Sequence, residues 1–266
     1  MSAKGYAGVV RMGFKQGLAY RFHFIIHIFT TPLSLVIYYF LWKAIFEFSK
    51  AQTIQGFTFQ GMVSYYALNM LVGFLIWTYV DEDLEDKILN GTLTPSLLRP
   101  LNYFWAIFYE HMGLNLLSLL LEIAPIIAIA VIFFGLSLPT PINALLSVIS
   151  VISAIFLNFT IAYITGLTAF WFGNIKGIRR MRRVVVSFLA GSFIPLTFFP
   201  AWAQSLSGYL PFQYLRYVPV TIYLGNTTVA GSLKLIAIGI VWAAALYLLS
   251  KSMWNIAYKK FAGSGT

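Results

Sequence analysis

The chain alternates long apolar runs with short polar segments, and each long run approaches the length that crosses a lipid bilayer. A helix needs about 20 predominantly apolar residues to span the hydrocarbon core. The third and fourth runs are longer and predict helices that tilt or extend beyond the bilayer. The pattern therefore predicts an all-α polytopic membrane protein with six transmembrane helices, at roughly 23–46, 61–80, 103–134, 142–173, 184–204 and 231–252.

Two shorter segments do not fit a simple span. Residues 1–22 are mixed and basic and predict an interfacial helix, with a basic leader that only sets the topology as the alternative. Residues 205–230 are apolar and aromatic but interrupted by proline and glycine. Interrupted helices are tolerated at membrane depth only where protein or a wet cavity satisfies their backbone. This segment therefore predicts an external re-entrant helical hairpin before span six, and the alternative is a surface loop packed on the bundle.

Composition excludes a soluble fold, and the charges orient the chain. Hydrophobic residues make up 59% of the sequence and charged residues 10%, against about 25% charged residues in average globular domains. Most of the 18 lysines and arginines face the cytoplasm if both termini are cytoplasmic, as the positive-inside rule requires. Topology thus explains the net charge of +10, and we expect no nucleic-acid partner. We expect a multi-pass protein of the cell (plasma) membrane, surrounded by lipid.

The segment 81–102 between spans two and three is short, charged and regularly punctuated. Three acidic residues open a predicted helix, where the helix dipole favours negative charge. Asp83 and Lys87 are spaced for an i,i+4 pair, and Gly91 is placed to end the helix. Thr94 and Pro95 predict a second short helical turn. Such a helix, with one apolar stripe, suits a groove on a partner protein; the alternative is a solvated loop that sets topology.

The order of several motifs resembles a known family. KILNGTL and LLRPLNYF follow the acidic residues between spans two and three, LPFQYLRYVPVTIYLG precedes the last span, and a basic segment leads into span one. In this order they resemble the permease subunits of ABC-2 type transporters, in the six-span branch encoded beside a separate ATPase. The resemblance covers nearly the whole chain and implies one transmembrane permease domain over residues 1–266.

The resemblance implies an ATP-driven exporter in which the segment 81–102 holds a cytoplasmic coupling helix. That helix would rest in a cleft of a P-loop ATPase, which carries the ATP and Mg, beside a second permease chain that is identical or paralogous. The basic loop 176–183 would be a second cytoplasmic contact; its alternative role is to set topology and attract anionic lipid. By the resemblance, the ATPase-coupling residues are Asp81, Glu82, Asp83, Glu85, Lys87, Gly91, Arg99 and Pro100, of which the last three match the family pattern best.

The chain lacks the motifs of an enzyme. It contains no G-x-x-x-x-G-K-[ST] sequence, no H-E-x-x-H and no cysteine. We therefore expect no catalytic residue, no metal and no cofactor bound by this chain. Polar residues within the spans are costly in lipid and mark candidates for the translocation path, although amides also serve only to join helices. The candidates are Asn69, Glu110, His111, Asn115, Glu122 and Asn158.

Two other classes compete with an ABC permease. A secondary transporter or channel working without an ATPase would show matching interruptions in both halves of the chain, whereas here they concentrate in the last third. An intramembrane enzyme would need convergent catalytic groups, for which only Glu110, His111 and Glu122 are available. The expected substrate is amphipathic or hydrophobic, and the sequence does not separate a drug, a peptide and a lipid.

Overall fold

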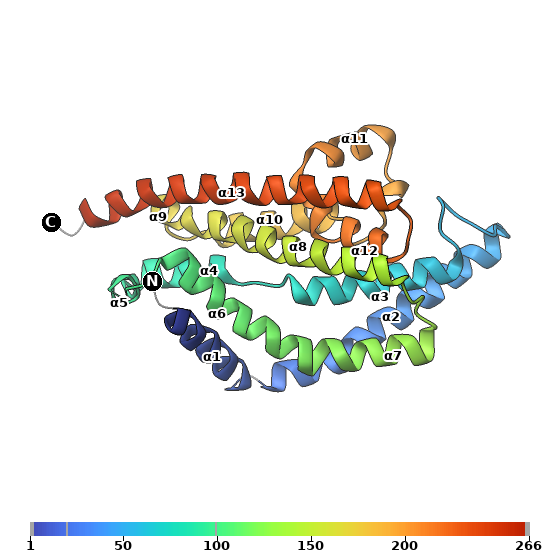
Figure 1. Ribbon diagram of the computed structural model, residues 1–266, viewed down its shortest axis with the longest axis horizontal. Coiled ribbons are helices and arrows are strands. Elements are labelled where there is room, and N and C mark those ends of the chain that lie inside the picture. The colour runs from blue at the N-terminus through green and yellow to red at the C-terminus, as the bar shows by residue number, and fades with distance from the viewer. Residues whose placement is uncertain (1–2, 20, 99, 264–266) are drawn as a thin grey trace.

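The computed structural model describes residues 3–19, 21–98 and 100–263, and leaves a few further side chains, including that of Glu122, outside the description. The described residues form an elongated bundle of helices without a strand (Figure 1). The start of the first helix and the end of the last helix lie at the same end of this bundle. The all-α class predicted from the sequence is confirmed.

Four helical stretches among the described residues are long and apolar enough to cross a membrane. They coincide with the second, third, fourth and sixth predicted spans. Three of them are assembled from consecutive helices rather than from one. The components are α3 (Phe59–Leu75) with α4 (Val80–Leu89); α6 (Tyr103–Ser118), the π-helical turn η1 (Leu119–Ile123) and α7 (Ala124–Phe134); α8 (Pro141–Leu167) with α9 (Ala169–Phe172); and α13 (Val229–Gly263).

Local sequence signals explain where these helices begin and end. Thr58 caps α3 by accepting a hydrogen bond from the backbone N–H of Gly61 at 3.1 Å. Thr140 caps α8 in the same way, with a proline at its first position. Both follow the preference for short hydroxyl side chains at the N-cap and proline at N1. α7 ends at Gly135, whose φ of 60° is a left-handed conformation that glycine adopts without strain.

The first and fifth predicted spans are not among these four. The first falls within the single helix α2 (Arg21–Ser49). The fifth predicted span, 184–204, is not a single helix: α10 (Lys176–Leu189) starts earlier and stops before Gly191. Gly191 has a φ of 75°, and its carbonyl accepts a hydrogen bond from the hydroxyl of Tyr65 at 2.6 Å. The chain then continues as η2 (Leu196–Phe198) and α11 (Ala201–Tyr209).

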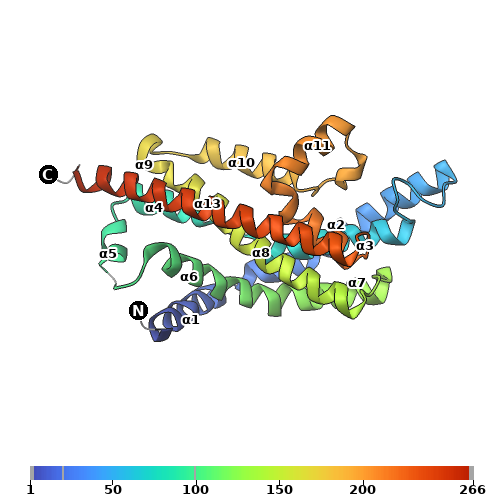
Figure 2. The ribbon, with the colours of Figure 1, turned by 45° about the horizontal axis from the view of Figure 1, so that its top comes forward.

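The segment predicted as a re-entrant hairpin, 205–230, is largely helical, and only its middle part is internal. α11 projects from the side of the bundle (Figure 2). The next two helices, η3 (Pro211–Leu215) and α12 (Tyr217–Tyr223), instead pack against α8, and α12 also contacts α3. Leu215 and Ile222 are fully buried there. Residues 211–223 therefore belong to the core and are not a loop on its surface.

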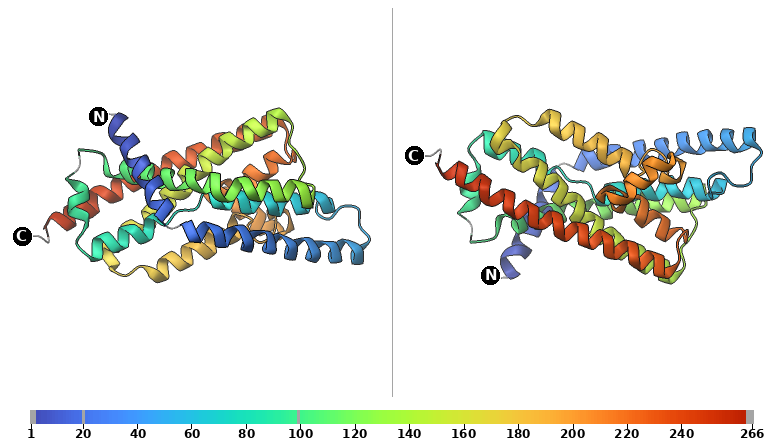
Figure 3. Two further views of the ribbon diagram at one scale, coloured as in Figure 1. Left: turned by 90° about the horizontal axis from the view of Figure 1, so that it is seen from below. Right: turned by 90° about the horizontal axis from the view of Figure 1, so that it is seen from above.

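The segment predicted to lie at the membrane surface is helical, as α1 (Ala3–Ala19), and this helix crosses α6 closely (Figure 3). The crossing is made by two glycines. A Cβ atom at Gly13 would lie 2.1 Å from the carbonyl oxygen of Glu110, and one at Gly113 would lie 2.2 Å from that of Val10. Any larger residue would force the two backbones apart. One face of α1 therefore packs directly against α6.

Candidate functional site

The acidic helix α4 starts and stops as its sequence predicts. Three acidic residues occupy its first turn, and Lys87 Nζ lies 2.7 Å from Asp83 Oδ2. Gly91 follows the helix with a φ of 68°. The second short helix, α5 (Leu93–Leu97), begins slightly before the predicted Thr94–Pro95 start. The residues that determine the two ends of α4 are close together in the sequence, so the sequence alone was enough to predict them.

The apolar stripe of α4 packs inside the protein. Leu84 is fully buried, and its Cδ1 would lie 2.9 Å from a Cβ at Gly166 of α8. The absence of a side chain at Gly166 therefore allows α4 to approach α8 closely. The sequence predicts this stripe to face a partner protein, but the structure places it against α8.

Three of the five acidic side chains of α4 form ion pairs with arginines of α10. Asp81 Oδ2 lies 2.7 Å from Arg182 Nη2, and Arg179 pairs with both Glu82 and Glu85, at 2.9 and 3.0 Å. The side chains of Asp81, Glu85 and Arg179 are each less than 10% exposed. The α4–α10 ionic cluster, formed by these five residues, therefore joins two helices that are about 100 residues apart in sequence.

One carboxylate of this cluster also fixes the start of α10. Glu85 Oε1 accepts a hydrogen bond from the backbone N–H of Ile175 at 2.9 Å. Ile175 is the N-cap residue of α10, and no side chain of its own caps that helix. A carboxylate at a helix N-terminus satisfies a free N–H and interacts well with the helix dipole. The basic segment 176–183 is thus the first half of a helix held by α4.

Sequence reasoning missed this pairing, although a signal for it exists. Asp81 and Glu85 are four residues apart, and Arg179 and Arg182 are three apart, so each pair shares one helix face. Two helix faces of opposite charge and matched spacing could have been paired. Their distance in the sequence concealed the match.

Beyond α4, the chain forms an exposed tip, which we define as residues 89–98. Leu89 is 53% exposed and Leu98 is 80% exposed. Asn90, Gly91 and Pro95 are exposed as well, whereas Leu93 is fully buried and anchors α5. Of the other residues predicted to couple, Pro100 is exposed and Arg99 lies outside the described residues. The tip lies at the same end of the bundle as the start of α1 and the end of α13 (Figure 1).

The polar residues predicted for the translocation path gather around a break between α3 and α4. Asn115 Nδ2 donates to the carbonyl of Leu75 at 3.0 Å, and Asn158 Nδ2 donates to that of Ile76 at 2.7 Å. His111 Nδ1 lies 3.3 Å from the hydroxyl of Thr78. These side chains satisfy backbone groups or neighbours at the break, as irregular backbone at membrane depth requires.

The remaining path candidates lie elsewhere. Asn69 Nδ2 donates to the carbonyl of Gly191 at 3.0 Å, and its Oδ1 accepts a hydrogen bond from Arg216 at 3.1 Å. Glu110 lies at the crossing of α1 and α6. Glu122 falls in the π-helical turn η1, but its side chain lies outside the described residues. The structure therefore brings three of the six candidates together at the break.

A comparison with protein-family models then places the chain. The model described as "ABC-2 family transporter protein" matches residues 33–265. The chain belongs to this family. The resemblance found in the sequence is confirmed, and the apolar helices together with this membership make the ABC-2 protein a multi-pass membrane protein. No curated protein matches it in a sequence comparison.

The hydrogen bond of Asn158 predicts a measurable loss of stability in the ABC-2 protein. We expect Asn158→Ala to lower the free energy of unfolding by about 1–2 kcal/mol, because the buried carbonyl of Ile76 would lose its donor. Unfolding of the purified protein in detergent, followed by its helical circular dichroism signal, measures the change. Asn226→Ala removes an exposed amide and is the matched control. Equal stability of the two variants would contradict a role for Asn158 at the break.

Proposed function

We propose that the chain is the permease subunit of an ATP-driven ABC exporter and forms one transmembrane permease domain with six spans. Membership of the ABC-2 family supports this proposal. The chain has no P-loop motif, so the energy would come from a separate ATPase subunit that binds ATP and Mg. A second permease chain, identical or paralogous, would complete the assembly. The substrate is an amphipathic or hydrophobic molecule that crosses the cell membrane.

We place the tip and both termini in the cytoplasm. The tip, the start of α1 and the end of α13 share one end of the bundle, and the arginine-rich helix α10 begins toward that end (Figure 2). The positive-inside rule favours such a placement. The ATPase would then contact the tip directly.

The observation that carries the proposal is the combination of an exposed tip with a firmly held α4. Leu89 and Leu98 expose apolar side chains, while Leu84 and the α4–α10 ionic cluster hold the preceding helix to α8 and α10. A force on the tip would therefore move α10 as well as α4. This arrangement suits a lever between an ATPase and the membrane helices.

The proposed role of the tip predicts a loss of ATPase binding. We expect Leu89→Asp together with Leu98→Asp to weaken copurification of the ATPase subunit at least about tenfold, equivalent to about 1.4 kcal/mol, because a charge would enter an apolar contact. Quantitative pulldown from native membranes measures the effect. Leu138→Asp changes an exposed leucine in the segment that joins α7 to α8, which lies at the end of the bundle opposite the tip (Figure 1), and is the control. Undiminished copurification in the tip variant would contradict docking at this site.

Variants of the acidic residues are a poorer test of docking. Reversing the charge of Asp81 or Glu85 would place two like charges at a buried contact with α10. The fold of this end of the protein would change together with any ATPase contact. The tip can be altered without breaking the ionic cluster, since none of its residues belongs to that cluster.

A further inference from the structure

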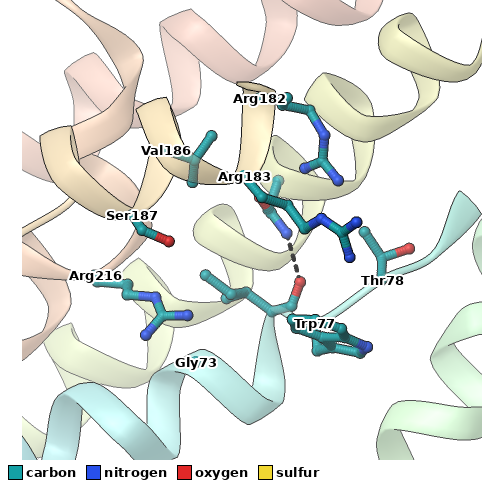
Figure 4. A pocket seen from close by; sticks show the side chains of 10 residues that line it. Gly73, Trp77, Thr78, Arg182, Arg183, Val186, Ser187 and Arg216 are labelled. Carbon is teal, nitrogen blue, oxygen red and sulfur yellow. Dashed lines mark hydrogen bonds between the residues drawn. The ribbon is translucent and has the colours of Figure 1, made fainter. Parts of the chain in front are cut away.

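A small cavity lies beside the break between α3 and α4, and its charged lining is entirely basic. Its volume is about 50 Å³, enough for a few water molecules or for one carboxylate or phosphate group by comparison with the space that one water needs. Three arginines line it, Arg182 and Arg183 from α10 and Arg216 from the segment between η3 and α12. No acidic side chain lines it among the described residues. Figure 4 shows these residues around the cavity.

Arg216 is held firmly but is not neutralised. Its Nη1 donates to the side-chain oxygen of Asn69 at 3.1 Å. A Cβ atom at Gly73 would lie 2.7 Å from the same nitrogen, so the glycine leaves room for the guanidinium. In Figure 4 the Arg216 side chain extends over Gly73. Among the described side chains no carboxylate forms an ion pair with Arg216.

The charges around the cavity leave a net positive potential. Asp81 neutralises Arg182 at 2.7 Å, whereas neither Arg183 nor Arg216 forms an ion pair among the described residues. A charge within a membrane bundle is costly unless it is paired or reaches water, and such a group marks a functional site by default. A guanidinium is well suited to bind a carboxylate or phosphate with two parallel hydrogen bonds. A carboxylate or phosphate is therefore the group that Arg183 and Arg216 are suited to bind.

The mouth of the cavity is apolar on one side. Trp77 belongs to the break and is 54% exposed, and Arg183 is also exposed. In Figure 4 the Arg183 side chain reaches toward Trp77 and Thr78. A ligand whose anionic group enters the cavity can therefore place an apolar portion against the indole of Trp77. The cavity is too small to enclose that portion.

We propose that this cavity binds the anionic group of an amphiphile, with Arg216 at its base and Arg183 at its mouth. This inference rests on the proposed function in one respect: it takes the bound amphiphile to be the transported molecule, with a carboxylate or phosphate head on an apolar body. The binding itself depends only on this chain. A membrane lipid and a soluble amphiphile share this chemistry, and experiment can separate the two sources.

The test uses the purified full-length protein in nanodiscs of neutral phosphatidylcholine, without ATPase, and dodecyl phosphate as the probe. We expect saturable binding that Arg216→Gln weakens at least about tenfold and that Arg183→Gln weakens about threefold, since a charge-assisted hydrogen bond contributes less where it is exposed to water. Arg180→Gln removes the same charge from an exposed position of α10 outside the cavity and should leave binding unchanged. Arg183 is exposed, so its variant remains informative if Arg216→Gln does not fold.

Each outcome decides the proposal. Equal binding by the native protein and both cavity variants would overturn it, and so would equally tight binding of dodecyltrimethylammonium, which has the same tail and the opposite charge. Inorganic phosphate that binds as tightly as dodecyl phosphate would show that the tail contributes nothing and would overturn the assignment of an amphiphile. If phosphatidylglycerol added to the nanodiscs displaces dodecyl phosphate, the natural ligand is a lipid. If it does not displace the probe, the natural ligand is a soluble molecule. If dodecyl phosphate binds as expected but no ATPase subunit copurifies with the protein from native membranes, the binding site is supported and the exporter proposal is contradicted.

Discussion

Arg179→Met is expected to lower the free energy of unfolding by about 3–5 kcal/mol, the range for breaking a buried ion pair by removing one partner. Arg179 pairs with Glu82 and Glu85, and the Glu85 side chain is only 2% exposed. The substitution would leave that carboxylate charged and buried without its counter-ion. Unfolding of the purified protein in detergent, followed by its helical signal, measures the loss.

Two further variants separate this mechanism from a general effect of losing an arginine. Arg180→Met removes an exposed neighbour on the same helix and should change the free energy of unfolding by no more than about 0.5 kcal/mol. Adding Glu85→Met to Arg179→Met should recover part of the lost stability, because it removes the unpaired buried charge, while the N–H of Ile175 loses its acceptor. If Arg179→Met and Arg180→Met lose the same amount, the cluster does not stabilise this end of the protein.

Gly13→Val is expected to detach α1 from α6. Its Cβ would lie 2.1 Å from a backbone oxygen of α6, and backbone cannot move aside as a flexible side chain can. The overlap exceeds ordinary over-packing, which costs about 1–3 kcal/mol. Because the natural chain contains no cysteine, Tyr6→Cys and Tyr109→Cys provide a clean pair for a short bismaleimide crosslink; the two tyrosine rings are 5.0 Å apart. We expect Gly13→Val to abolish most of that crosslink.

Gly8 supplies the matched control for this experiment. It lies on the same helix, is exposed, and has no atom within 4 Å of the position where a Cβ would be added. Gly8→Val therefore carries the same change in helix propensity without the overlap. Crosslinking should persist in this variant. Persistence in Gly13→Val too would show that α1 does not depend on the close crossing.

The features that sequence predicted correctly depend on neighbours in the chain. The end of α4 at Leu89, the left-handed Gly91 and the pair of Asp83 with Lys87 all follow from residues a few positions apart. The apolar runs likewise located four of the spans, because hydropathy is a property of a contiguous segment. Such signals need no knowledge of the fold.

The features that sequence did not predict depend on distant partners. The sequence predicts Asp81 and Glu85 to be surface charges, because their partners, Arg182 and Arg179, lie 101 and 94 positions later in the chain. The end of α3 at Leu75, ahead of the predicted end of span two at residue 80, was also missed, since Asn115 and Asn158 supply hydrogen bonds to the backbone there from two other helices. The polarity of these amides within apolar spans was visible, but their partners were not. Hydropathy over 184–204 likewise hid the stop at Gly191, where Tyr65 of α3 contributes the hydrogen bond.

The ionic cluster has a consequence for biosynthesis. The ribosome completes α4 long before it makes α10, so Asp81 and Glu85 must await arginines that are still untranslated. Unpaired carboxylates strongly disfavour entering a lipid environment. The nascent α4 should therefore stay in contact with water and dock onto α8 only after residue 182 has left the exit tunnel. Ribosome-bound chains that end before and after this point should differ in the protection of α4 from protease.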